Sequence, residues 1–170
     1  MRNVVIFGGL AFALLLPTAL IVQKEILLAT GKPVLLDLGP RDPRSLMQGD
    51  YMVLDYAISR AWEWSQNWPR DGHLVLRLDE HGVGQFVRRH DSSTPLAPDE
   101  FLLRYRVRDK RIQLGAEAFF FQEGHASRYN AARYGELRVA ANGTSVLVGL
   151  RGEDREPLGA SPVAPNRSEP

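Results

Sequence analysis

The chain has 170 residues, of which 21 are Lys or Arg and 20 are Asp or Glu, so its formal net charge is only +1. This balance argues against a nonspecific binder of nucleic acid or of another polyanion. The absence of cysteine excludes a disulfide framework, a zinc ribbon and thiolate chemistry. A chain of this length predicts one domain of ordinary size.

An uncharged apolar segment runs from Val4 to Val22, close to the roughly 20 residues that a helix needs to cross a bilayer. Arg2 followed by an apolar run also fits a cleaved signal peptide, but no Ala-x-Ala stands near the end of the run, and the helical pattern continues to Gly31. We therefore expect an uncleaved signal anchor in residues 1–31 that contacts the membrane through residues 4–22.

The orientation of this anchor is harder to predict, because basic residues stand on both sides of it. Arg2 precedes the apolar segment, whereas Lys24, Lys32 and Arg41 follow it. Long trailing domains are translocated largely regardless of their charge, and the leading tail is very short. We expect the N-terminus inside and the following domain in a non-cytoplasmic compartment, as in a single-pass periplasmic domain.

Residues 32–151 alternate apolar and polar side chains in short runs separated by turn residues, which predicts an antiparallel β domain in meander order. A sandwich and a partly open barrel both fit. Asn142-Gly143 is the strongest hairpin signal, and the four-residue connection Asp79–Gly82, with Gly where a positive φ is required, predicts another hairpin. The predicted strands cover residues 34–38, 51–58, 74–78, 83–88, 101–107, 111–114, 118–121, 136–140 and 144–150.

One short helix is predicted at residues 123–134, where β-branched residues are absent and Gly135 follows. The run 118–121 before it is aromatic and suits a buried strand. From residue 152 onward, prolines stand among Gly, Ser and charged residues, which predicts a disordered tail in 152–170.

The segment Gly49–Tyr56 reads Gly-Asp-Tyr-Met-Val-Leu-Asp-Tyr, and it resembles the signature of the GDYXXLXY protein family letter for letter. Residues 119–124, 132–139 and 148–151 are also similar to the C-terminal half of that family. The resemblance implies a bacterial protein anchored in the inner (cytoplasmic) membrane, with no assigned activity. It also implies a possible partner, a multi-pass membrane protein encoded beside it.

The first candidate site is the start of this motif. In a strand, Leu54 and Tyr56 share one face and are expected to be core residues, while Tyr51 points to the other face. Asp50 and Tyr51 are therefore the members that could reach a ligand or partner, although Asp50 also suits a simple turn acceptor.

The second candidate site is the polar cluster around the predicted helix. On a helix, Tyr129 and Arg133 share a face and could bind a carboxylate or phosphate. The alternative is structural: Glu123 caps the helix, Arg133 pairs with Glu123 or Glu136, and the tyrosines pack. The cluster consists of Gln122, Glu123, His125, Arg128, Tyr129, Arg133 and Tyr134, and all but His125 and Arg128 are taken as binding candidates.

The four histidines show no metal-ligand spacing, and no nucleophile stands with a base and its partner, so we expect no metal, no cofactor and no catalytic site. The basic row Arg104, Arg106, Arg108 and Arg111 fits either lipid phosphates or a solvated strand face. The sequence favours a membrane-tethered accessory domain that docks on a multi-pass membrane protein. The alternative is a ligand-binding or hydrolytic pocket between the Tyr51 strand and the Tyr129/Arg133 helix.

Overall fold

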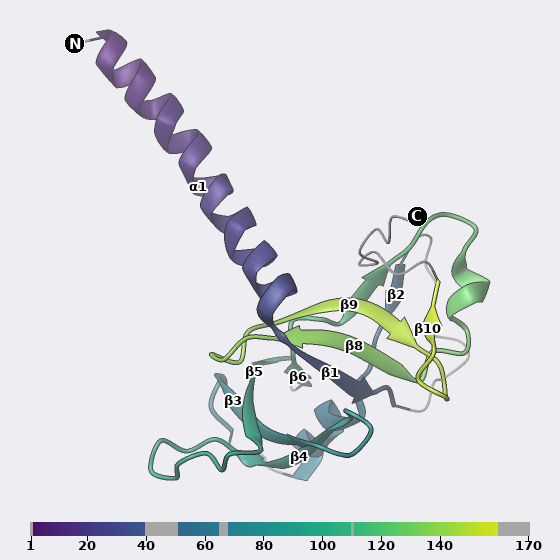
Figure 1. Cartoon of the computed structure of the whole chain (residues 1–170). Coiled ribbons are helices and arrows are strands. Elements are labelled where there is room, and N and C mark those ends of the chain that lie inside the picture. Colours follow the sequence, from purple (N-terminus) through teal and green to yellow (C-terminus); the bar gives the residue numbers. More distant parts are fainter. Residues whose placement is uncertain (1, 40–50, 65–67, 110, 160–170) are drawn as a thin grey trace, which may run out of the picture.

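The computed structural model describes residues 2–39, 51–64, 68–109 and 111–159, and it shows one long helix projecting from a β domain (Figure 1). The predicted fold class, mainly antiparallel β behind an N-terminal apolar helix, is confirmed. The elements in chain order are α1 (Arg2–Thr30), β1 (Lys32–Asp37), β2 (Tyr51–Val53), the 3₁₀ helix η1 (Ala57–Trp64), β3 (Asp71–Leu78), β4 (Gly84–Arg89), β5 (Glu100–Arg108), β6 (Arg111–Gln113), β7 (Ala118–Phe120), the 3₁₀ helix η2 (Ala126–Tyr129), β8 (Tyr134–Val139), β9 (Ser145–Arg151) and β10 (Pro157–Leu158).

Helix α1 joins the β domain without a linker. Leu27, in its last turn, is only 6% exposed, and the N–H of Gly31 donates to the Leu27 carbonyl at 2.8 Å. The Arg138 guanidinium on β8 donates to the Gly31 carbonyl at 3.2 Å. A side chain at Gly31 would approach the Leu27 carbonyl and Arg138, so the chain passes from helix to strand through a position that only glycine fits. The helix is therefore fixed to the sheet that it enters.

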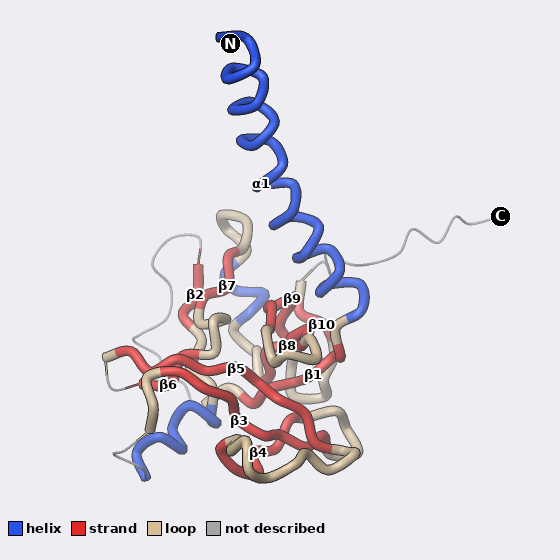
Figure 2. Tube along the Cα trace, turned by 90° about the vertical axis from the view of Figure 1, so that its left-hand side faces the viewer, coloured by secondary structure: helices blue, strands red, loops and turns tan. Residues whose placement is uncertain are grey.

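Two four-stranded antiparallel sheets form the body of the domain (Figure 2). One has the order β1-β8-β9-β10 and the other the order β4-β3-β5-β6. They meet where Leu35 pairs with Val83, and again where the β8–β9 turn reaches β5 through the Arg104 N–H and the Gly143 carbonyl, 2.8 Å apart. The predicted hairpin turns are present, with positive φ at Gly82 and Gly143. The arrangement is a partly open barrel.

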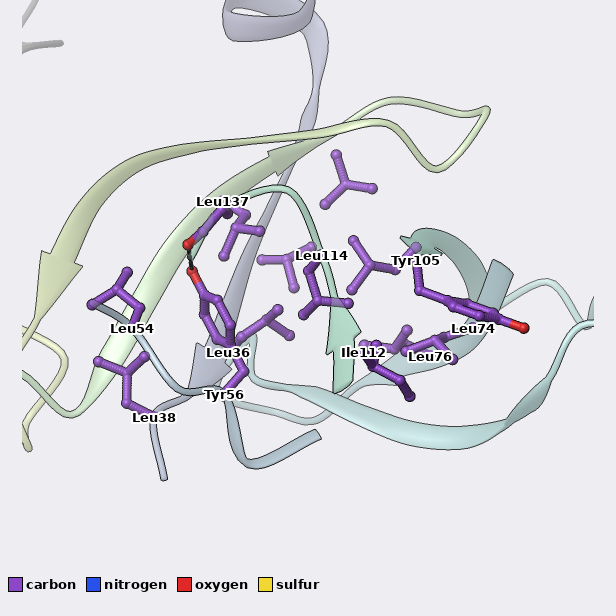
Figure 3. Packing of buried hydrophobic residues seen from close by; sticks show 14 of the residues in the cluster. Leu36, Leu38, Leu54, Tyr56, Leu74, Leu76, Tyr105, Ile112, Leu114 and Leu137 are labelled. Atoms are coloured by element: carbon purple, nitrogen blue, oxygen red, sulfur yellow. Dashed lines mark hydrogen bonds between the residues drawn. The ribbon is translucent and has the colours of Figure 1, made fainter. Parts of the chain in front are cut away.

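The small sheet β2-β7 carries the motif strand and closes one end of the core (Figure 2). As predicted, side chains alternate along it: Met52, Leu54 and Tyr56 are buried, while Val53 is exposed. Figure 3 shows Leu36, Leu38, Leu54, Tyr56 and Leu137 on one side of the core and Leu74, Leu76, Tyr105 and Ile112 on the other, with Leu114 between them. All described sheets thus share one hydrophobic core.

The motif strand is shorter than predicted, because its pairing with β7 ends at Val53. Tyr56 then forms an isolated bridge with Leu38, and the chain turns into η1. The inward alternation continues past the end of the strand, so the side-chain pattern was predicted correctly although the pairing was not.

The helix predicted at residues 123–134 is wrong: only the single turn η2 forms. Gly124 has a φ of 80°, which breaks a helix, and Arg133 already belongs to the sheet region, where its N–H donates to the Arg151 carbonyl at 2.8 Å. Gly135 lies inside β8 and ends no helix. Sheet pairing here overrides the local preference for a helix.

Two further predictions, for strand β7 and for the residues after 151, differ from the structure. Strand β7 is only partly buried, because Phe119 packs inward while Phe120 is 72% exposed. Past residue 151 the chain is described to residue 159, and Pro157–Leu158 pairs with β9 as β10. The remainder of the predicted tail, residues 160–170, lies outside the described residues.

Gly135 provides a direct test of the core. A Cβ at Gly135 would lie 2.9 Å from the Tyr56 ring, whereas a Cβ at Gly149, paired to the next residue along β8, would meet only Glu136 at 3.9 Å. We expect Gly135→Ala to destabilise the folded chain by about 1–3 kcal/mol through overpacking. Gly149→Ala, the matched control, is expected to be close to neutral. Thermal unfolding of the full chain in detergent, followed by circular dichroism, measures both; equal stability of the two variants would contradict the packing described.

Candidate functional site

A cavity of about 500 Å³ lies beside the second half of the motif. Its walls come from three parts of the chain: the motif residues before η1, the start of η1, and β6 with the turn after it. The lining residues are Val53, Leu54, Asp55, Tyr56, Ser59, Arg60, Arg111, Ile112, Gln113 and Glu117. We call it the motif cavity.

Tyr56 fixes the floor of the motif cavity. Its ring lies in the core (Figure 3), and its hydroxyl donates to the Ala116 carbonyl at 2.8 Å. The ring also occupies the space where a Cβ at Gly135 would stand. Burial, and secondly the negative Glu117, raises the pKa of Tyr56 far above the ordinary tyrosine value of 10.0. The hydroxyl is therefore a neutral structural donor that joins the motif to the segment before β7.

Glu117 organises the turn between β6 and β7. Its Oε1 accepts the backbone N–H groups of Leu114 and Gly115, and its backbone carbonyl accepts the Leu54 N–H at 2.7 Å. A carboxylate that accepts two backbone donors replaces the capping partner that a short turn lacks. Glu117 thus holds the motif strand and the turn together, and its carboxylate is occupied.

The charges at the mouth of the motif cavity are balanced. The Arg60 guanidinium pairs with Asp55 at 2.9 Å and lies over Gly39, where a side chain would collide with it. Both partners are about half exposed, so the pair contributes little to stability. The fourth charged wall residue besides Asp55, Arg60 and Glu117 is the exposed Arg111.

This arrangement contains no catalytic constellation among the described residues. Of the two hydroxyl side chains in the wall, Tyr56 donates to the Ala116 carbonyl and Ser59 has no histidine beside it in the cavity lining. Glu117 is committed to backbone donors. Across the described part of the chain, no group of three His, Asp or Glu side chains is placed to hold a metal ion. The motif cavity offers mixed polar contacts and no activated nucleophile.

Of the first predicted site, Asp50 lies outside the described residues. Tyr51 is half-buried on the outer face of β2 and packs against Phe120 of β7, with ring centroids 5.7 Å apart. Its role in the described structure is an aromatic contact on an exposed face.

The second predicted cluster is not brought together around one cavity in the described structure. Tyr129 is buried in the core between Phe119 and Phe121, at centroid distances of 5.0 and 5.3 Å. Arg133 is exposed and pairs with Asp37 at 3.4 Å, not with Glu123 or Glu136 as the structural alternative proposed. Gln122 and Glu123 are exposed in the turn after β7, and Tyr134 begins β8 half-buried.

The sequence reasoning missed Arg60 and Gln113 of the motif cavity. Arg60 lies two residues past the predicted strand 51–58, on η1, and this short helix was not predicted. The available signal was Asp55 five residues before Arg60, a spacing that a turn or helix brings together more readily than a strand does.

The fold and site define a mainly antiparallel β domain behind one N-terminal helix; the segment Phe12–Thr30 of that helix is long and apolar enough to cross a membrane by length and composition. The chain belongs to the GDYXXLXY protein family, whose family model matches residues 13–150, which include the later part of α1 and most of the β domain. No curated protein and no solved structure matches it.

The raised pKa of Tyr56 predicts a pH dependence. Below about pH 10 the tyrosine is neutral in both states, but at higher pH it ionises in the unfolded chain and not in the folded one, so stability falls as pH rises. We expect Tyr56→Phe to lose about 1 kcal/mol at neutral pH, because the Ala116 carbonyl loses its donor, and to show a shallower alkaline decline. Part of the decline remains, since burial also raises the pKa of Tyr105. Thermal unfolding of both proteins from neutral pH to above about pH 10 measures this difference. If stability declines equally steeply with pH in Tyr56→Phe and in the unsubstituted chain, the burial of the Tyr56 hydroxyl is contradicted.

Proposed function

We propose that this protein is a membrane-tethered accessory subunit whose β domain docks on a multi-pass membrane protein, with α1 spanning the bacterial inner membrane and the β domain on its non-cytoplasmic side. The exposed apolar side chains of α1 support the tether. Its described large side chains are about half or more exposed over most of the helix, including Phe7, Leu15 and Ile21. Water solvates such a surface poorly, whereas lipid does so at no cost.

The length of α1 agrees with this placement. At 1.5 Å per residue its 29 residues reach about 43 Å, more than the roughly 30 Å of a bilayer core. A span beginning at Val4 ends near Val22, before Lys24 and before Leu27, which is buried against the β domain. Because Gly31 leads directly into β1, the β domain is held close to the membrane surface.

The observation that carries the docking proposal is the exposed apolar face of β2-β7. Val53 is 52% exposed and Phe120 is 72% exposed, while Tyr51 packs beside Phe120. Their neighbours Met52 and Phe119 point inward and fill the core. Three apolar groups on the outside of a two-stranded sheet are a surface that a protein partner can cover.

Strand β2 lies toward the end of the β domain from which α1 leaves, and β4 lies at the opposite end, as both views show (Figures 1 and 2). A partner reaching the β2-β7 face is therefore one that projects from the same membrane. A multi-pass membrane protein, which contacts α1 in the bilayer and the β2-β7 face above it, meets both requirements.

The alternative, a ligand pocket between the Tyr51 strand and the Tyr129/Arg133 segment, has less support. Tyr51 lies on the outer face of β2, and Tyr129 is in the core behind β7. Neither they nor Arg133 line the motif cavity. Docking on a membrane partner is therefore the better supported of the two functions.

Site-specific photo-crosslinking tests the docking face. We expect a benzoyl-phenylalanine in place of Phe120 to crosslink in intact cells to one multi-pass membrane protein, because that side chain faces the partner and its exposure allows the substitution. The matched control is Leu96, an apolar residue 39% exposed in the connection from β4 to β5, which is expected to give no such product. Mass spectrometry of the purified adducts identifies the partner. The same products from both positions, or lipid adducts alone from position 120, would refute docking through this face.

A further inference from the structure

A second cavity, of about 290 Å³, lies at the foot of α1. It is formed where the end of the helix, β5, the turn after β6 and the β8–β9 hairpin come together. Its walls are Lys24 from α1, Arg104 and Arg106 from β5, the segment Gln113–Gly115, and Thr144 with Ser145. We call it the foot cavity.

The foot cavity is strongly cationic. Lys24, Arg104 and Arg106 line it, and no carboxylate does. Among the described residues none of these three side chains forms an ion pair, although Asp71 is the cross-strand neighbour of Arg106. Other arginines of the described chain do have carboxylate partners: Arg60, Arg77, Arg88, Arg133 and Arg151. Three positive side chains are thus gathered around one cavity that has no carboxylate in its walls.

The walls of the foot cavity are held in position by backbone contacts. The Arg104 N–H donates to the Gly143 carbonyl at 2.8 Å, which places the β8–β9 turn on β5. The Ser145 hydroxyl donates to the Leu114 carbonyl at 3.2 Å, which joins that hairpin to the turn after β6. Gly143 fits only without a side chain, because a Cβ there would meet His73 and the Arg104 backbone. Burial of Leu27 fixes the end of α1 beside them.

The position of Lys24 in the sequence indicates where the foot cavity lies relative to the bilayer. It follows the uncharged run Val4–Val22 by two residues, so it stands where an apolar span meets the headgroups. Arginine and lysine bind phosphate oxygens through charge-assisted hydrogen bonds, and arginine does so with two parallel donors. A phosphate group is the anion that a bilayer presents at this level.

We propose that the foot cavity binds the phosphate of an anionic phospholipid headgroup, through Lys24, Arg104 and Arg106. The inference rests on the proposed function only in requiring that α1 spans a bilayer. The bound headgroup neutralises the cluster and fixes the β domain in one orientation above the membrane, with the β2-β7 face presented to the partner.

The test uses the full chain in nanodiscs of phosphatidylcholine containing a minor fraction of phosphatidylglycerol. Native mass spectrometry after release measures which lipid the protein retains. We expect enrichment of phosphatidylglycerol in the unsubstituted chain and a loss of roughly tenfold or more in the double variant Arg104→Gln/Arg106→Gln. Arg108→Gln/Arg111→Gln removes the same charge from the same two-stranded region outside the foot cavity, and it is expected to retain the lipid.

Three outcomes separate the possible failures. Equal loss in both double variants, or loss in neither, overturns the foot cavity as the binding place. Displacement of the retained lipid by inorganic phosphate at a comparable concentration shows a free-phosphate site and overturns the lipid assignment. Flotation of each protein with vesicles is measured in parallel: if the unsubstituted chain does not float, the membrane tether fails, whereas a chain that floats without enriching phosphatidylglycerol leaves the tether intact and refutes this inference.

Discussion

The structure depends on one constraint: a long helix with exposed apolar side chains is joined to a β domain without a linker. Leu27 is buried, Gly31 allows no side chain, and Arg138 holds the Gly31 carbonyl, so helix and domain form a stiff joint. If the helix lies in lipid, every surface of the domain has a defined direction relative to the membrane. The proposals for the β2-β7 face and for the foot cavity both depend on this orientation, because each site lies near the end of the domain that the helix holds.

The family motif is explained mainly by packing. Tyr56 reaches the core, donates to the Ala116 carbonyl and occupies the space that Gly135 leaves open. Gly135 stands in the other stretch of sequence that resembles the family, so the two stretches meet in space at this contact. Leu54 is buried beside it, and its N–H is held by the Glu117 carbonyl. Tyr51 differs, because it lies on the outside, where it packs against Phe120 on the exposed apolar face of β2-β7.

The sequence predicted what depends on local pattern and failed where distant segments compete. Alternation placed Met52, Leu54 and Tyr56 inward, and Gly82 and Gly143 marked their turns, because strand geometry and positive φ are properties of a few neighbouring residues. The helix expected at 123–134 does not form, because Arg133 hydrogen-bonds with Arg151 of β9. Helix propensity depends on neighbouring residues only, so it cannot predict a contact with a strand that follows later in the chain. Without that helix, Tyr129 and Arg133 do not share a helix face: Tyr129 packs between Phe119 and Phe121, and Arg133 pairs with Asp37. The sequence showed the arginines of the foot cavity as a row on one strand. It did not predict the cavity, because Lys24 in the same wall lies 80 residues earlier than Arg104 in the chain.

The most direct test of the account is the state of the mature protein in its membrane. Membranes from expressing cells are washed with alkaline carbonate, and the intact mass of the protein is measured in the pellet and in the supernatant. The account predicts that the chain stays in the pellet with the apolar segment Val4–Val22 retained. A chain that begins after residue 22 and is recovered in the supernatant would contradict it.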